Sequence, residues 1–118
     1  MGVKRIVANV RTADNAAALA FYGGILDMDV VMDHGWIVTL AGSGGGNPAP
    51  QLSFATEGGN GTPVPDLSIE VDNLDEVLQR VAAAGLAPEY GPAEEPWGVR
   101  RFFIRDPFGR LLNILQHL

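Results

Sequence analysis

The chain has 118 residues, of which 47% are hydrophobic, with a formal net charge of −6 and no cysteine. This length and apolar fraction predict one compact domain with a real core, and they exclude a disordered chain. The acidic balance argues against nucleic-acid binding, and no apolar run reaches the roughly 18 residues of a membrane span. The lack of cysteine and of a secretory pattern favours a cytoplasmic protein without disulfides or thiolate metal sites.

Hydrophobic alternation and turn residues divide the first half of the chain into one strand, one helix and three more strands. Asp14 or Asn15 can cap the helix, and Gly23 ends it. The glycine-rich residues 42–50 lack the Lys and Ser/Thr of a phosphate-binding loop, which favours a flexible hairpin tip. The predicted elements are a strand over residues 1–12, a helix over 16–22 and strands over 30–33, 36–40 and 51–56.

The second half follows a strong break at residues 58–65 (GGNGTPVP), which we interpret as a linker. Its helix can be capped by Asp72 or Asn73 and is closed by Gly85. Glu94 and Glu95 are predicted to lie in a solvated acidic loop. The predicted elements are a strand over 66–71, a helix over 74–81, a short strand at 89–90 and a buried hairpin of strands 99–105 and 110–116 joined by Asp106-Pro107-Phe108-Gly109.

Both halves therefore have the same order of elements, which predicts an α+β fold of two βαβββ modules. The single domain over residues 1–118 would consist of module 1–57, linker 58–65 and module 66–118. One helix covers one face of a module's sheet, so the other face of these curved mixed sheets must close around a core, a partner or a cleft. Unpaired buried polar groups cost about 1–3 kcal/mol each, so polar side chains there favour a ligand-sized cleft. We assign to that face Asn9, Arg11, Trp36, Gln51, Ser53, Asp66, Ser68, Glu70, Arg101 and Asn113.

Several of these residues have both a functional and a structural interpretation. Asp66 and Glu70 lie four residues apart on one strand face, where they could serve as acid and base, bind a cation or form a solvated rim. Arg100 and Arg101 point to opposite faces, so Arg101 is predicted to share the cleft with Phe103 while Arg100 is solvated or salt-bridged. His34 and His117 are lone histidines without a neighbouring Ser or Cys nucleophile, which favours structural roles.

Three motifs carry a resemblance to a known family. They are Ala20-Phe21-Tyr22 followed by Ile25-Leu26-Asp27, Glu70-Val71-Asp72-Asn73-Leu74-Asp75, and Arg105-Asp106-Pro107-Phe108-Gly109-Arg110. With the paired modules, they resemble the vicinal oxygen chelate superfamily of glyoxalases, extradiol dioxygenases, fosfomycin-modifying enzymes and bleomycin-resistance proteins. The resemblance covers essentially the whole chain and implies the fold more strongly than any activity.

The metal-using members of that family carry His, Glu or Gln ligands at four positions. The resemblance places Val7, Ser53, Asp66 and Asn113 at these positions. Of the four, only Asp66 is a good ligand for a divalent ion. The expectation is therefore a protein without a metal or other cofactor.

The resemblance is strongest to the bleomycin-resistance type, whose members sequester a toxic natural product between aromatic side chains. Trp97 matches their loop tryptophan and Trp36 their strand aromatic, although Trp36 could equally fill the core. The implied function is a metal-free binding protein, rather than an enzyme, for a small aromatic or cationic antibiotic-like ligand, with no catalytic residue. The predicted ligand-binding residues are Trp36, Trp97, Asn9, Gln51, Ser53, Asp66, Arg101, Phe103 and Asn113.

Two alternatives remain open at this point. One is a metal-dependent lyase, isomerase or dioxygenase whose ligands lie elsewhere, and the other is a cofactor-free enzyme with Asp66 or Glu70 as base. The resemblance also implies a homodimer that completes the cleft, and in this family the two copies can exchange a strand or a module. Neither nucleic acid nor a membrane is expected as a partner.

Overall fold

A computed structural model describes residues 1–44 and 49–118, so the centre of the predicted hairpin tip at 42–50 lies outside the described residues. The chain forms two compact units. Unit 1 comprises Met1–Ile6 with Pro65–Leu118, and unit 2 comprises Val7–Val64. The first strand, β1 (Val3–Arg11), begins in unit 1 and ends in unit 2.

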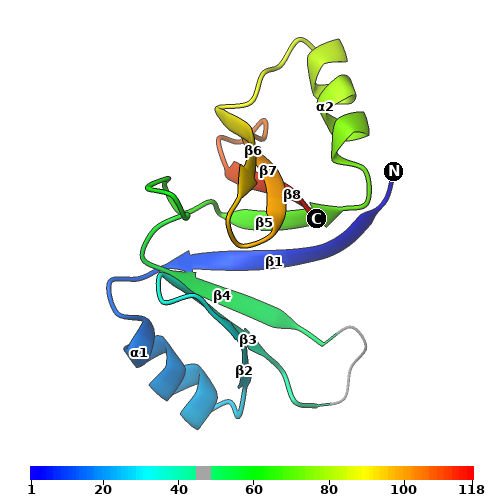
Figure 1. The fold of residues 1–118 in the computed structure, drawn as a ribbon. Coiled ribbons are helices and arrows are strands. Elements are labelled where there is room, and N and C mark those ends of the chain that lie inside the picture. The colour runs from blue at the N-terminus through cyan, green and yellow to red at the C-terminus, as the bar shows by residue number, and fades with distance from the viewer. Residues whose placement is uncertain (45–48) are drawn as a thin grey trace. The chain divides into compact units, whose positions relative to one another are not determined.

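Unit 2 contains the first strand–helix–three-strand repeat. After β1 come α1 (Asn15–Ala18), a π-helical continuation η1 (Leu19–Gly23), β2 (Asp29–Asp33), β3 (Ile37–Ala41) and β4 (Gln51–Ala55). The strand order is β2-β3-β4-β1, in which β1 and β4 run parallel and the other neighbours antiparallel (Figure 1). The predicted cap is confirmed, because the Asp14 side chain accepts a hydrogen bond from the Ala17 N–H at 3.1 Å.

The core of unit 2 lies between α1 and one face of this sheet. Ala18, Val38, Leu40 and Phe54 are buried there, and Tyr22 packs against them. Strand alternation therefore leaves the other face of the sheet without a helix from its own unit.

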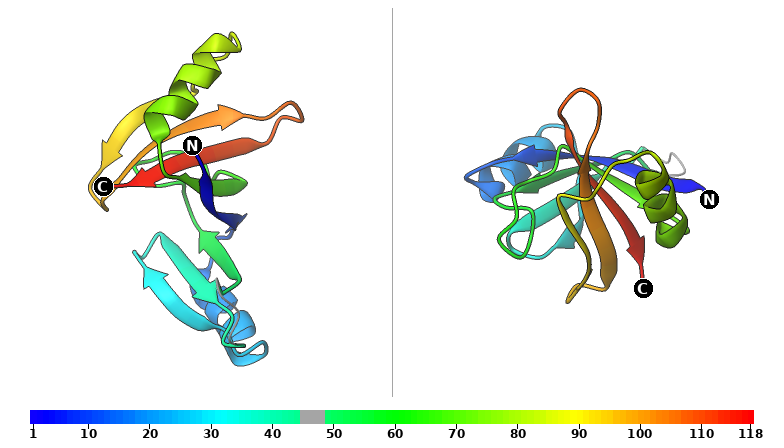
Figure 2. Two further views of the ribbon diagram at one scale, coloured as in Figure 1. Left: turned by 90° about the vertical axis from the view of Figure 1, so that its right-hand side faces the viewer. Right: turned by 90° about the horizontal axis from the view of Figure 1, so that it is seen from above.

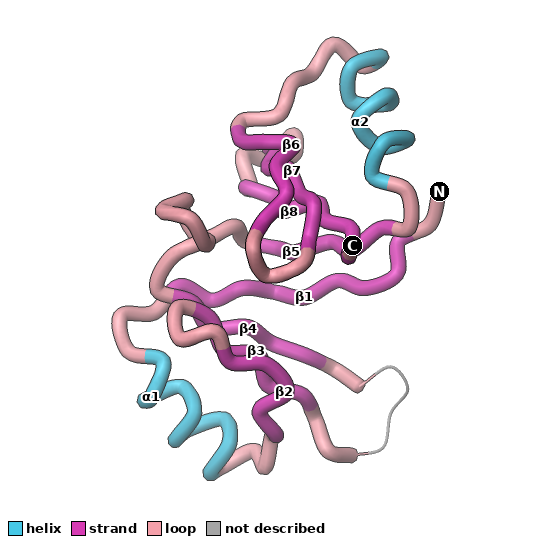
Figure 3. The backbone as a smooth tube through the Cα atoms, viewed as in Figure 1, coloured by secondary structure: helices cyan, strands magenta, loops and turns pink. Residues whose placement is uncertain are grey.

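Unit 1 contains the second repeat in the same order (Figure 3). Its elements are β5 (Leu67–Val71), α2 (Leu74–Ala83), β6 (Tyr90–Glu95), β7 (Val99–Arg105) and β8 (Leu111–His117). The strand order is β1-β5-β8-β7-β6, with β5 and β8 parallel. The predicted α+β class with two βαβββ repeats is confirmed.

Helix α2 packs along one side of the unit 1 strands, as both views in Figure 2 show. Its residues Val77, Leu78 and Val81 pack against the buried cluster that contains Phe102 and Ile114. Asn73 caps the helix by accepting from the Glu76 N–H, and Gly85 follows its end with φ +77°. The opposite face of this sheet carries no helix of unit 1.

The β7–β8 turn has the predicted chemistry. Asp106 Oδ1 accepts from the N–H groups of Phe108 and Arg110 at 2.8 and 2.9 Å, and Gly109 adopts φ +83°. Asp is favoured in such a turn because it accepts backbone hydrogen bonds, Pro because its ring fixes φ, and Gly because it tolerates a positive φ. The turn thereby fixes the register in which Phe103 lies opposite Asn113.

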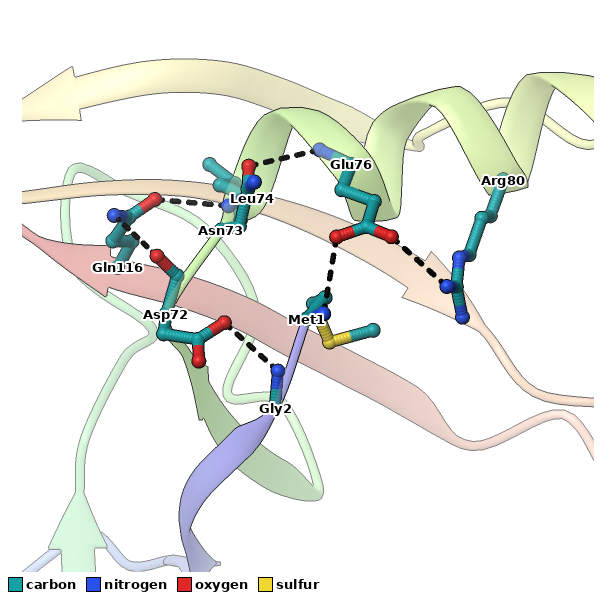
Figure 4. Close-up of polar contacts among 8 residues, drawn as sticks. All are labelled: Met1, Gly2, Asp72, Asn73, Leu74, Glu76, Arg80 and Gln116. Carbon is teal, nitrogen blue, oxygen red and sulfur yellow. Dashed lines mark hydrogen bonds and ion pairs between the residues drawn. The ribbon is translucent and has the colours of Figure 1, made fainter.

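The start of the chain is tied to the α2 region of unit 1 (Figure 4). The Gly2 N–H donates to Asp72 Oδ1 at 2.8 Å, and the Met1 α-amino group lies 3.1 Å from Glu76 Oε2. Glu76 also pairs with Arg80 one helical turn later, at 2.9 Å. Among these contacts, the hydrogen bond from the α-amino group is the main cause that lowers the pKa of Glu76, followed by the charge of that amine.

This lowered pKa predicts how Glu76 contributes to stability as pH changes. A carboxyl whose pKa is lower in the folded state stabilises the fold above its unfolded pKa, and the contribution disappears as pH falls through the folded pKa. We therefore expect the stability advantage of the parent chain over Glu76→Gln to be present at pH 6 and to be lost as pH falls below the ordinary glutamate pKa of about 4.3 and through the lower pKa of the folded state. Urea unfolding of both proteins across this range measures it, and a pH-independent difference would contradict the assignment.

Candidate functional site

The face of the unit 1 sheet opposite α2 gathers most of the predicted site residues; we call it the helix-free face of unit 1. Cross-strand register aligns Ser68, Asn113 and Phe103 in one row over β5, β8 and β7. A second row contains Glu70, Leu115 and Arg101. Asn113, Phe103 and Arg101 are all buried, so this face combines polar chemistry with low exposure to water.

Arg101 is the centre of a buried polar and aromatic cluster on that face. Its Nη2 donates to Glu95 Oε2 at 2.9 Å, and both side chains are almost fully buried at 3% and 2% exposure. The Tyr90 hydroxyl donates to the other carboxylate oxygen of Glu95 at 2.8 Å. The guanidinium carbon lies 4.8 Å from the ring centroid of Phe103, 4.9 Å from that of Trp97 and 5.3 Å from that of Tyr90.

The prediction of a solvated loop at Glu94 and Glu95 was wrong in placing them in a loop and in exposing Glu95, while Glu94 is exposed as predicted. Strand β6 extends to Glu95, and Glu95 pairs with Val99 in the hairpin register. A buried carboxylate requires a hydrogen-bonded partner, which Arg101 and Tyr90 supply. The tight Pro96-Trp97-Gly98 segment was the available signal, because a hairpin tip there places Glu95 on a strand.

Trp97 lies between β6 and β7, beside the Arg101 guanidinium. Its side chain is half-buried. The Arg101 guanidinium and the indole ring form a cation–π pair, which helps to hold the Trp97 side chain in place.

Asn113 has an unused acceptor. Its Nδ2 donates to the Ser68 Oγ at 3.1 Å, while its buried Oδ1 has no hydrogen-bond partner among the described residues. The side chain is only 9% exposed. A buried amide oxygen without a donor is costly, so this atom is suited to accept a hydrogen bond from a ligand.

The two carboxylates weighed as acid and base have separate structural partners. Asp66 Oδ2 accepts from the Leu111 N–H at 2.9 Å, and the Asp66 N–H donates to the Leu111 carbonyl at 2.8 Å. Glu70 lies 2.8 Å from His117 Nδ1, 3.5 Å from Arg5 Nε and 3.9 Å from Lys4 Nζ. Arg100 pairs with Asp75 at 2.6 Å, which confirms its predicted salt-bridged role.

The predicted site residues of unit 2 divide between the two faces of its sheet. Asn9 and Ser53 are paired across β1 and β4, and Gln51 shares their face. The Ser53 hydroxyl lies 2.7 Å from the hydroxyl of Thr39. Thr39 is buried, and the sequence analysis did not predict it as a site residue. The Thr56 N–H donates to the Trp36 carbonyl at 2.9 Å, which continues the β3–β4 register to Trp36. Alternation then places Trp36 on the side of Val38 and Leu40, which pack under α1, rather than with Asn9 and Ser53.

The donor chemistry at the four family metal positions does not fit a divalent ion. Val7 is a buried hydrocarbon, and the Ser53 hydroxyl is bonded to Thr39. In unit 1 the Asp66 carboxylate is engaged by the Leu111 backbone and Asn113 is neutral. Within the part of the chain that the structure describes, no three His, Cys, Asp or Glu side chains form a group that could hold a metal.

The family model for the glyoxalase/bleomycin resistance protein/dioxygenase superfamily matches residues 3–114. The chain belongs to this superfamily. No curated protein matches the chain. None of its described helices is both long enough and apolar enough to cross a membrane.

Solved structures show the same glyoxalase fold. A Legionella pneumophila protein named an NAD-dependent benzaldehyde dehydrogenase is 16% identical with a TM-score of 0.74, over 97% of this chain and 100% of that one. A superfamily member from Vibrio splendidus 12B01 is 18% identical with a TM-score of 0.68, over 98% and 99% of the two chains. The methylmalonyl-CoA epimerase of Mycobacterium tuberculosis is 21% identical with a TM-score of 0.67, over 99% and 88%. Identities this low show the fold alone, and chemistry varies widely on such scaffolds.

Proposed function

We propose that this superfamily member binds and sequesters a small aromatic or cationic molecule, of antibiotic type, without a metal and without turning it over. The observation that carries the proposal is the set of side chains at the family's four metal positions. Only one of them, Asp66, is a carboxylate, and the backbone of Leu111 already uses it. An ion held by one such ligand would bind too weakly for catalysis at ordinary metal concentrations.

The helix-free face of unit 1 supplies chemistry for an organic ligand instead. Trp97 offers a half-buried ring for stacking, and a pair of stacked rings contributes roughly 0.5–1.5 kcal/mol beyond burial. Asn113 Oδ1 is a buried acceptor without a partner among the described residues, suited to an ammonium, amide or hydroxyl donor. These two features together favour a flat ligand with a hydrogen-bond donor. The homodimer expected from the sequence remains part of this proposal.

Binding can be tested with the chain's two tryptophans. We expect bleomycin-like and polycyclic cationic compounds to quench the fluorescence of the Trp36→Phe protein, whose remaining indole is Trp97, in a saturable manner. Trp97→Ala should weaken binding about tenfold or more in calorimetry, because tryptophans are frequent hot spots in binding interfaces. Trp36→Ala is the matched control and should change affinity little, because its register places it on the α1 side.

The same experiment distinguishes binding from catalysis. Mass spectrometry of the compound after incubation, with and without added Mn²⁺, Ni²⁺, Zn²⁺ or Fe²⁺, should recover it unchanged. Metal-dependent conversion would contradict the proposal and favour the enzyme class, while metal-free conversion lost in Glu70→Gln would favour a cofactor-free enzyme. Equal affinity loss in both tryptophan variants would contradict the assignment of the site to unit 1.

A further inference from the structure

Arg11 is distinct among the cationic residues of the chain. It is the only lysine or arginine in residues 7–64, which also contain the acidic residues Asp14, Asp27, Asp29, Asp33 and Glu57. Among all lysines and arginines, only the side chains of Arg11 and Arg110 have no ion pair or hydrogen bond within the described part of the chain. Because Arg11 is exposed and forms no ion pair within the described residues, its guanidinium is available for a ligand.

The acidic groups nearest to Arg11 in sequence and along the sheet are occupied elsewhere. Asp14 Oδ1 accepts from the Ala17 N–H at the start of α1, at 3.1 Å. Glu57 Oε1 accepts from the Gly61 N–H at 2.9 Å. Each of these two carboxylates is thus bonded to a backbone donor, and within the described part of the chain neither forms an ion pair with Arg11.

Arg11 lines a pocket of about 440 Å³ together with Thr12, Ala13 and Thr56. All four residues belong to unit 2, at the ends of β1 and β4. Its volume is within the range of small-molecule sites, and the hollow is open to solvent, because Arg11, Ala13 and Thr56 are exposed. Main-chain bonds hold the two threonines in place, from Thr12 N to the Ala55 carbonyl and from Thr56 N to the Trp36 carbonyl, both 2.9 Å.

The hydroxyl groups add donors next to the guanidinium. Thr12 Oγ1 accepts from the Asp14 N–H at 2.9 Å, so its own proton is available to a ligand. The Thr56 hydroxyl makes only a long 3.5 Å contact to the Trp36 carbonyl and can rotate away from it. A forked guanidinium flanked by hydroxyl donors matches the geometry of a carboxylate or a phosphate.

We propose that this pocket is a binding site for a small anionic group, a carboxylate or phosphate, held by Arg11 with Thr12 and Thr56. The site lies in unit 2 and does not depend on the proposed function, whose residues lie on the helix-free face of unit 1. An organic ligand that carries such a group would use it for recognition.

Titration of the isotope-labelled protein by NMR tests the site with inorganic phosphate and with acetate, at constant ionic strength set by chloride. We expect saturable shifts of the Thr12, Ala13 and Thr56 amide signals by at least one of the two anions, and none by chloride alone. Arg11→Gln should weaken this binding about tenfold or more, since it removes a charged fork, and Arg11→Lys should weaken it less. Arg110→Gln, which removes the other unpaired arginine, should leave it unchanged.

Three results would overturn the proposal. They are linear shifts that follow ionic strength for both anions, shifts centred on Arg110 rather than on the pocket, and an Arg11→Gln protein that binds as tightly as the parent chain. The preferred anion identifies the chemical class, because phosphate and acetate differ in charge and in the number of acceptor oxygens. None of these readouts uses an aromatic ligand, so the outcome is separate from that of the tryptophan experiments.

Discussion

Replacing Arg101 by methionine is expected to lower the free energy of unfolding by about 3–5 kcal/mol, because it leaves the buried Glu95 carboxylate without its cation. Both side chains of this ion pair are at most 3% exposed, so water cannot take over the lost interaction. Urea unfolding followed by circular dichroism measures the change. The Tyr90 hydroxyl alone cannot offset it, since a neutral donor compensates only part of a buried charge.

The chain contains a matched control for this experiment. Arg105 pairs with Glu89 at the same 2.9 Å distance, but both side chains are 48% exposed. Arg105→Met should therefore cost no more than about 1 kcal/mol, as exposed ion pairs usually do. The double variant Glu95→Gln with Arg101→Met should recover part of the loss, because no charge then remains buried. Equal losses in Arg101→Met and Arg105→Met would show that the Glu95–Arg101 pair is not an interior one.

The Glu95–Arg101 pair also shows where sequence reasoning reaches its limit. Adjacent glutamates before a Pro-Trp-Gly segment have the composition of a solvated loop, and nothing local distinguishes Glu95 from Glu94. Their difference arises from the β6–β7 register, which aligns Glu95 with Val99 and Glu94 with Arg100. Which of two neighbours faces inward depends on a single residue of register, so composition alone could not settle it.

Local signals, by contrast, predicted the fold well. Asp14, Asn73 and Asp106 make the side-chain bonds to backbone N–H groups that their positions suggested, and Gly109 has the positive φ that the turn requires. These interactions span at most four residues, so the sequence contains both partners side by side. Alternation in β5 likewise separated Ile69, which packs under α2, from Ser68 on the other face.

The site was less predictable because its contacts connect distant parts of the chain. The engagement of Asp66 by the Leu111 N–H joins residues 45 positions apart, and it turns a potential ligand into a structural group. Trp36 is predicted to line the cleft because it is an aromatic residue at a family position. The hydrogen bond from the Thr56 N–H to the Trp36 carbonyl continues the β3–β4 register, and this register places Trp36 on the α1 side of the sheet. Long-range partners decide whether a polar or aromatic residue is available to a ligand, and only the structure supplies them.

A second large effect is expected from Phe102→Ala, which should cost about 3–5 kcal/mol of unfolding free energy. Phe102 is fully buried and packs with Leu74 and Ile114 beneath α2, so its truncation leaves a cavity that the surrounding strands cannot close. Phe108→Ala is the matched control, because Phe108 is 86% exposed in the adjoining turn and should change stability by no more than about 0.5 kcal/mol. Paired urea unfolding curves measure both changes.

The comparison also tests which face of β7 forms the core of unit 1. Phe102 and its neighbour Phe103 are equally buried but lie on opposite faces of the strand. Loss of Phe102 should therefore increase amide hydrogen exchange in α2, whose residues Val77 and Leu78 pack around it, by more than loss of Phe103 does. If Phe103→Ala exposed α2 to exchange as much as Phe102→Ala, the division into a helix-covered face and a helix-free face would be wrong. The proposal that Asn113 receives a ligand on the helix-free face would then lose its basis.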